Sequence, residues 1–168
     1  PSMLKQLEAL KNVQVWRFSL YYFFVFGGFV GLSLWLPRFL VGAYHLDIKA
    51  AGLVAIAFSA PAGLFRIYGG HLADRFGARQ VMYWTFLVAV ASTFLLSYPP
   101  THYIVDGVNG PIAFSIATSL PVFAIIIFVL GFFMSLGAAA VFKHIPTYYP
   151  KNVGAIGGLD GVGLVVGL

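Results

Sequence analysis

Long apolar runs are the feature that most restricts the fold of this chain. A helix needs about 20 predominantly apolar residues to cross the hydrocarbon core of a bilayer. Four complete runs of this kind occur, and a fifth is still apolar at the last residue; they cover residues 18–36, 50–73, 80–98, about 120–142 and about 153–168. Only 9% of the residues are charged, whereas a soluble domain typically carries about 25%. The sequence therefore predicts an all-α integral membrane protein with about five transmembrane helices in the lipid bilayer.

Lysine and arginine are divided unevenly between the two ends of the predicted spans. One side holds two of them, Arg38 and Lys49, and the other holds seven: Lys5, Lys11, Arg17, Arg75, Arg79, Lys143 and Lys151. Loops rich in Lys and Arg are retained in the cytoplasm. We therefore expect residues 1–17 to be a cytoplasmic lead and residues 18–168 to be the transmembrane domain. The same rule accounts for the net charge of +5, so no nucleic-acid partner is expected.

Residues that would carry enzyme chemistry are sparse. The chain has no cysteine, which excludes disulfides and thiolate-bound metals. His45, His102 and His144 lie in predicted loops, and His71 lies near the end of the second predicted span. The spacing of these histidines matches no metal site, and the sequence contains no Ser–His–Asp set and no phosphate-binding loop. We therefore expect neither an enzyme nor a metal or other cofactor.

A single arginine, Arg66, interrupts the second predicted span. An arginine within a span costs at least about 2.5 kcal/mol, so such residues usually face a cavity or a partner. No Asp or Glu shares the span, and small residues lie on or beside the Arg66 face: Ser59, Ala62, Gly63, Gly69 and Gly70. A guanidinium group suits a planar oxyanion because it donates two parallel hydrogen bonds and keeps its charge. The sequence predicts an anion site here; the alternative is a snorkelling or structurally paired arginine.

Two further features are candidates for contact with a ligand or for helix movement. Tyr22 and Phe26 are spaced i, i+4 on the first span and are expected to stack on one helix face. They would contact a planar anion, although such aromatic residues also face lipid or the core. In the fifth span, four glycines fall within an arc of about 100°; they are Gly154, Gly157, Gly158 and Gly161. Such a smooth face lets a neighbouring helix slide, or serves as an ordinary packing seam.

Glycines and charged residues cluster after the second predicted span, where residues 70–79 read GHLADRFGAR. Gly77 permits a tight reversal between two helices. Asp74 is close enough in sequence to pair with Arg75, Arg79 or the N-terminus of a neighbouring helix. One interpretation is an ordinary charged turn that holds the topology.

The same segment resembles G-x-L-x-D-R-x-G-x-R, the cytoplasmic loop motif of the major facilitator superfamily. That family carries the motif between its second and third spans, where it falls here. The resemblance implies a gate, in which an ion pair is made in one transport state and broken in the other. The gating residues would be Gly70, Asp74, Arg75, Gly77 and Arg79.

Three segments together resemble the nitrate/nitrite porters (NarK type) of that superfamily: SLYYFFVFGGFVGLS, GLFRIYGGHLADRFGAR and YYPKNVGAIGG. The resemblance implies the major facilitator fold, with this chain forming helices 7 to 11 of its second six-helix half. Arg66 would be the anion-binding arginine of that half, with Tyr22 and Phe26 as the aromatic pair that contacts nitrate. The Gly-rich spans would take part in rocking. One departure is Asp160, which stands where the family usually has an apolar or small residue.

The resemblance implies a secondary transporter that moves nitrate, nitrite or both across the bacterial inner membrane by alternating access. The chain begins at Pro1 and ends within an apolar run, and we expect it to lack the N-terminal half of the transporter, which would supply a partner arginine. The alternative is another major facilitator that carries small organic anions such as monocarboxylates. A membrane-embedded enzyme or receptor subunit would require clustered His, Asp or Glu within the spans.

Overall fold

A computed structural model of the chain describes residues 13–98, 101–108 and 110–148. In chain order its elements are α2 (Val13–Tyr22), the π-helical turn η2 (Phe23–Gly27), α3 (Gly28–Tyr44), α4 (Ile48–Leu64), α5 (Arg66–Phe76), α6 (Ala78–Leu96), β1 (Thr101–Gly107), β2 (Gly110–Ile116) and α7 (Leu120–Tyr148). Most of the predicted cytoplasmic lead, the fifth span and its four glycines, and Asp160 lie outside the described residues.

The described helices include several that match membrane spans. Among them, three segments are long and apolar enough to cross a bilayer: Val13–Tyr44, Ala78–Leu96 and Leu120–Lys143. The first of these is α2, η2 and α3 in succession. α4 and α5 together meet the same criterion, but a bend of 49° separates them. These helices confirm the predicted all-α membrane class, with one addition outside the bundle.

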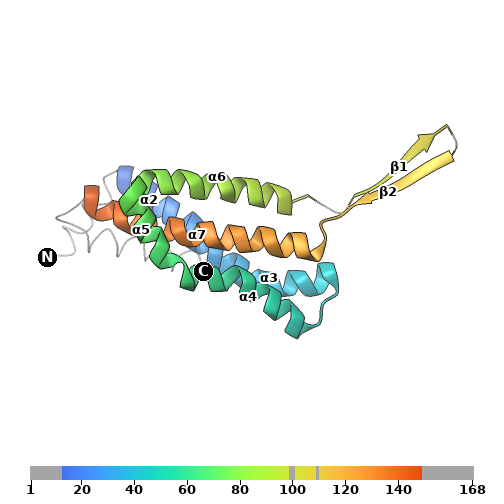
Figure 1. Ribbon diagram of the computed structural model, residues 1–168, viewed down its shortest axis with the longest axis horizontal. Coiled ribbons are helices and arrows are strands. Elements are labelled where there is room, and N and C mark those ends of the chain that lie inside the picture. The colour runs from blue at the N-terminus through green and yellow to red at the C-terminus, as the bar shows by residue number, and fades with distance from the viewer. Residues whose placement is uncertain (1–12, 99–100, 109, 149–168) are drawn as a thin grey trace.

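That addition is a β-hairpin between α6 and α7, where the sequence predicted only a loop. β1 and β2 pair antiparallel over their whole length, and the hairpin projects from one end of the helical bundle (Figure 1). Val108 and Asn109 connect the paired residues Gly107 and Gly110, and Gly110, the first residue of β2, has a φ of 121°, which glycine adopts without steric cost. A hydrogen bond of 2.9 Å joins the Tyr98 and Tyr103 hydroxyl groups and raises the pKa of Tyr103 above its usual 10.0.

The second apolar run, predicted as one span over residues 50–73, is two helices. Phe65 lies between α4 and α5 with φ −97° and ψ 0°, and its N–H donates to the carbonyl oxygen of Pro61 at 2.8 Å. A proline inside a helix removes one hydrogen bond and crowds the turn that precedes it, which for Pro61 is the turn of residues 57–61, whereas the break follows Pro61. Pro61 lies within α4, four residues before the break. Arg66 thereby becomes the first residue of α5.

α7 is the central helix of the bundle. It packs most extensively against α6, α4 and α5, and Figure 1 shows it running between α6 and the α3–α4 pair. Glycines allow these close approaches, because a Cβ added at any of three positions would overlap a neighbouring helix. The overlaps pair Gly131 with the backbone of Phe58, Gly69 with the backbone of Leu136, and Gly137 with the side chain of Thr85.

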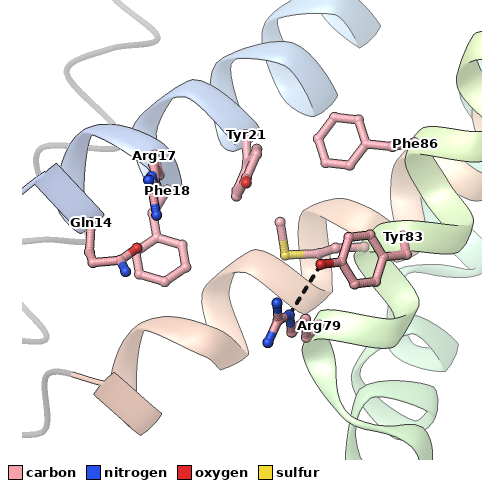
Figure 2. Close-up of a pocket in the computed structure, with 8 residues that line it drawn as sticks. Gln14, Arg17, Phe18, Tyr21, Arg79, Tyr83 and Phe86 are labelled. Atoms are coloured by element: carbon pink, nitrogen blue, oxygen red, sulfur yellow. Dashed lines mark hydrogen bonds between the residues drawn. The ribbon is translucent and has the colours of Figure 1, made fainter.

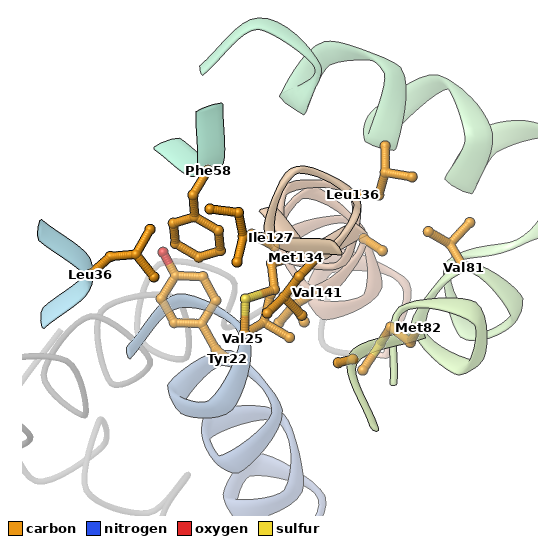
Figure 3. Packing of buried hydrophobic residues seen from close by; sticks show 14 of the residues in the cluster. Tyr22, Val25, Leu36, Phe58, Val81, Met82, Ile127, Met134, Leu136 and Val141 are labelled. Atoms are coloured by element: carbon orange, nitrogen blue, oxygen red, sulfur yellow. The ribbon is translucent and has the colours of Figure 1, made fainter. Parts of the chain in front are cut away.

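Apolar side chains fill the space on both sides of α7. Figure 3 shows Phe58 of α4 facing Ile127 of α7, while Val81 and Met82 of α6 lie on the opposite side of that helix. Phe58, Ile127 and Val81 are no more than 1% exposed. One buried polar group crosses the α6–α7 contact, since the Thr85 hydroxyl lies 3.1 Å from the carbonyl oxygen of Phe133. The resulting packing holds α4, α5 and α6 around a common axis.

Candidate functional site

A cavity of about 290 Å³ lies among η2, the start of α3, the α4–α5 break and α7. Its wall combines small, apolar and hydroxyl-bearing residues with one guanidinium group. The lining residues are Val25, Phe26, Phe29, Ser59, Ala62, Gly63, Arg66, Met134, Ser135 and Ala138. Three of the five small residues predicted beside Arg66 line the cavity, namely Ser59, Ala62 and Gly63.

Arg66 enters this cavity from the N-terminal end of α5. The first N–H groups of a helix lack intrahelical partners and carry partial positive charge. The guanidinium group and the positive end of a half-helix therefore occur together. No carboxylate of the described residues forms an ion pair with Arg66. The arrangement favours a small anion in the cavity.

The structure brings Phe26 to the same cavity as Arg66, and it places Tyr22 one contact away. The Tyr22 and Phe26 rings stack with their centroids 5.3 Å apart and an angle of 7° between planes. Tyr22 also meets Phe142 of α7 edge-on at 4.9 Å, and the Arg66 guanidinium lies over the Phe142 ring at 5.9 Å. Sequence reasoning did not identify Phe142, because it lies on α7 whereas Tyr22 and Arg66 lie on other helices. It connects the arginine to the aromatic pair.

Phe26 lies on an irregular helical turn, and Tyr22 is the last α-helical residue before it. Residues 23–27 form the π-helical turn η2, so Phe26 does not lie in a regular α-helix. π-helical turns within α-helices are rare and occur frequently at functional sites. This turn also carries Val25 to the cavity wall.

Ser135 is a second polar residue that sequence reasoning missed. It lines the cavity, it is only 4% exposed, and its hydroxyl oxygen has no hydrogen-bond partner among the described residues. A buried hydroxyl without a partner is costly, so its partner is expected to be water or a ligand. No local pattern marks this serine, because only the packing of α7 against η2, α3 and α4 brings it to the cavity.

The predicted gating motif joins α5 to α7. Asp74, near the end of α5, forms an ion pair with Lys143 of α7, a partner that the sequence spacing did not single out. Gly77 has a φ of 87° and lies between α5 and α6, as a tight reversal requires. Arg79 lies over the Tyr83 ring, and its Nε donates to the Tyr83 hydroxyl at 3.3 Å. Arg75 lies over the ring of the next residue at 5.4 Å, and Gly70 has no atom near its missing Cβ.

Three bacterial relatives are similar to this chain over 95% of its residues. A probable nitrate/nitrite antiporter, NarK1, of Thermus thermophilus is 45% identical, a nitrite extrusion protein of Bacillus subtilis is 32% identical, and a probable nitrate transporter, NarT, of Staphylococcus epidermidis is 30% identical. The chain spans 36–38% of the length of these relatives. They confirm the resemblance to the nitrate/nitrite porters.

No solved structure matches the chain. A family model does match it. The model of the Major Facilitator Superfamily matches residues 18–168, which include every residue that lines the cavity. This chain therefore belongs to the major facilitator superfamily, a family of multi-pass membrane transporters.

Proposed function

We propose that this chain is part of a secondary transporter that moves nitrate or nitrite by alternating access, with Arg66 binding the anion. The observation that carries the proposal is Arg66 itself, an exposed residue at the start of a broken helix on the wall of a half-open cavity. Among the residues that line the cavity, Arg66 is the charged one. Transporters commonly place their substrate at such broken helices, with the helix N-terminus directed at an anionic group.

The aromatic and hydroxyl groups complete the proposed site. Phe26 offers a ring face to a planar anion, and Tyr22 and Phe142 hold that ring and the guanidinium group in one set of contacts. Ser135 supplies a hydroxyl donor whose buried oxygen otherwise lacks a partner among the described residues. Hydrogen bonds to a charged group are stronger than those to a neutral one. The anion would therefore be held by charge and by directed donors.

A second cation would come from the part of the transporter outside this chain, because the relatives continue well beyond the matched region.

We propose a bacterial inner-membrane location with the N-terminal side of this chain in the cytoplasm. On that side the ion pair of Asp74 with Lys143 would close α5 against α7 in one state. Both side chains are partly exposed, and exposed pairs contribute only about 0–1 kcal/mol. A contact this weak can be broken in each transport cycle. The glycines of residues 154–161 stay a prediction for the sliding surface.

A carrier of small monocarboxylates is the second candidate. The cavity of about 290 Å³ is several times the roughly 30 Å³ that one water occupies. It therefore has room for nitrate with water or for a small carboxylate. Arg66 would bind either anion, so the size of the cavity and its charge do not separate the two substrates. Competition between anions is the measurement that does.

The test uses the full transporter that contains this chain, reconstituted into proteoliposomes. Arg66→Lys keeps the charge and loses the bidentate geometry, so nitrate uptake should fall. Arg38→Lys, on an exposed residue of α3, is the matched control and should transport normally. Uptake at full affinity in Arg66→Lys would refute the anion site. Chlorate and nitrite should compete with nitrate; competition by acetate in their place would favour the monocarboxylate carrier.

A further inference from the structure

A second pocket, of about 220 Å³, lies between α2 and the start of α6. Figure 2 shows its polar side chains: Gln14, Arg17 and Tyr21 from α2, and Arg79 and Tyr83 from α6. None of its lining residues belongs to the cavity that contains Arg66. We propose that this pocket binds the phosphate headgroup of an anionic phospholipid.

The charge of the pocket favours a phosphate group. Two guanidinium groups, those of Arg17 and Arg79, line it, and none of the lining residues is acidic. Arg79 is the second residue of α6, whose first turn also lacks an acidic side chain, so the positive end of the helix dipole adds to the same potential. Guanidinium groups bind phosphate oxygens through paired hydrogen bonds.

The Arg79 side chain is held in place for such a contact. Its Nε donates to the Tyr83 hydroxyl at 3.3 Å, and its guanidinium lies 5.7 Å from the Tyr83 ring centre. On the other wall, the Tyr21 ring packs against Phe86 with centroids 5.3 Å apart, which joins α2 to α6 beneath the pocket. The pocket therefore has a fixed aromatic floor and charged walls.

The apolar surface beyond the pocket identifies a lipid as the occupant. Both α2 and α6 belong to segments that match membrane spans. One or two turns further along from Arg17, Leu20 is 64% exposed and Phe24 is 39% exposed. On α6, Leu87 and Val90 are 72% and 64% exposed, and they follow the pocket residues at helical spacing. A headgroup in the pocket would leave its acyl chains along these apolar side chains, as for other basic pockets between transmembrane helices.

The experiment measures lipid binding to the purified full transporter, with no nitrate present. Phosphatidylglycerol and phosphatidylcholine are titrated separately in detergent, and bound lipid is counted by native mass spectrometry. Phosphatidylglycerol should bind more tightly to the unmodified protein. Arg17→Gln should weaken that binding about fivefold, as expected for the loss of one interfacial basic residue. Arg17→Lys should retain most of it.

Arg38→Gln is the matched control, because Arg38 is also an exposed arginine of the segment Val13–Tyr44 but lies outside the pocket. It should bind phosphatidylglycerol as the unmodified protein does. Arg66→Lys should also bind it normally, so this test is independent of the proposed anion site. Equal affinity for the two lipids, or no effect of Arg17→Gln in a folded protein, would overturn the proposal. Complete displacement of phosphatidylglycerol by inorganic phosphate would assign the pocket to a soluble anion and would overturn it too.

Discussion

Replacing Gly69 with alanine should force α5 away from α7. A Cβ at this position would lie 2.8 Å from the Cα of Leu136 and 2.9 Å from the Cβ of Ala139, whereas carbon atoms pack at about 3.5–4.0 Å. These neighbours cannot rotate out of the way, so the two helices must separate by about 0.7 Å or more. Overpacking of this kind costs about 1–3 kcal/mol.

Gly70 provides the matched control for Gly69. A Cβ at Gly70 would meet no atom within 4 Å. Both positions lie within α5, where alanine is favoured over glycine by about 0.5–1 kcal/mol. Because both variants gain this term, the difference between them reports the packing of α5 against α7 alone. Gly69→Ala should therefore be less stable than Gly70→Ala by about 1–3 kcal/mol.

The assay for this pair is reversible unfolding of the purified full transporter in mixed micelles, followed by circular dichroism as the fraction of denaturing detergent rises. The quantity compared is the free energy of unfolding of the two variants. Because α5 carries Arg66 as well as Asp74, Gly69→Ala should also lower nitrate uptake. Equal free energies of unfolding for Gly69→Ala and Gly70→Ala would refute the close contact between the two helices.

Two further substitutions test the proposed site and gate. Ser135→Ala should weaken nitrate binding by about tenfold or more, since a hydrogen bond to a charged group contributes about 1.5–3 kcal/mol. Ser33→Ala removes the other buried hydroxyl without a partner in the described part of the chain, and it should leave nitrate binding unchanged. Equal effects of the two substitutions would count against the Ser135 contact. Asp74→Asn should change the rate of nitrate uptake while altering the free energy of unfolding by less than about 1 kcal/mol. Asp106→Asn in the hairpin should change neither quantity, and normal uptake in Asp74→Asn would contradict the gate.

Features that depend on one helix and its surroundings were predictable from the sequence. The apolar runs predicted membrane helices, because hydropathy summed along a helix decides whether it enters lipid. The charge of Arg66 predicted a cavity or partner, because an arginine in lipid is costly. The stacking of Tyr22 on Phe26 followed from helical spacing, although the turn that carries Phe26 is π-helical.

Two local departures had signals that lay within the sequence. Pro61 lies four residues before the break in the second span, and glycines at positions 107 and 110 flank the turn of the hairpin. In the second span the apolar composition was the stronger pattern, and in the hairpin segment the glycines and prolines indicated a loop. An apolar run is compatible with one straight helix, a bent pair or a strand, and hydropathy alone does not distinguish these.

Contacts between helices were decided only by the tertiary structure. The pairing of Asp74 with Lys143, the position of Phe142 over Arg66 and the buried hydroxyl of Ser135 all depend on α7 lying at the centre of the bundle. α7 takes that place because glycines let its neighbours approach it closely. Lipid is as apolar as most of these side chains, so helices in a membrane associate through close packing and a few polar contacts. The sequence by itself therefore determined that these segments enter the membrane, and the fit between their surfaces determined which side chains meet.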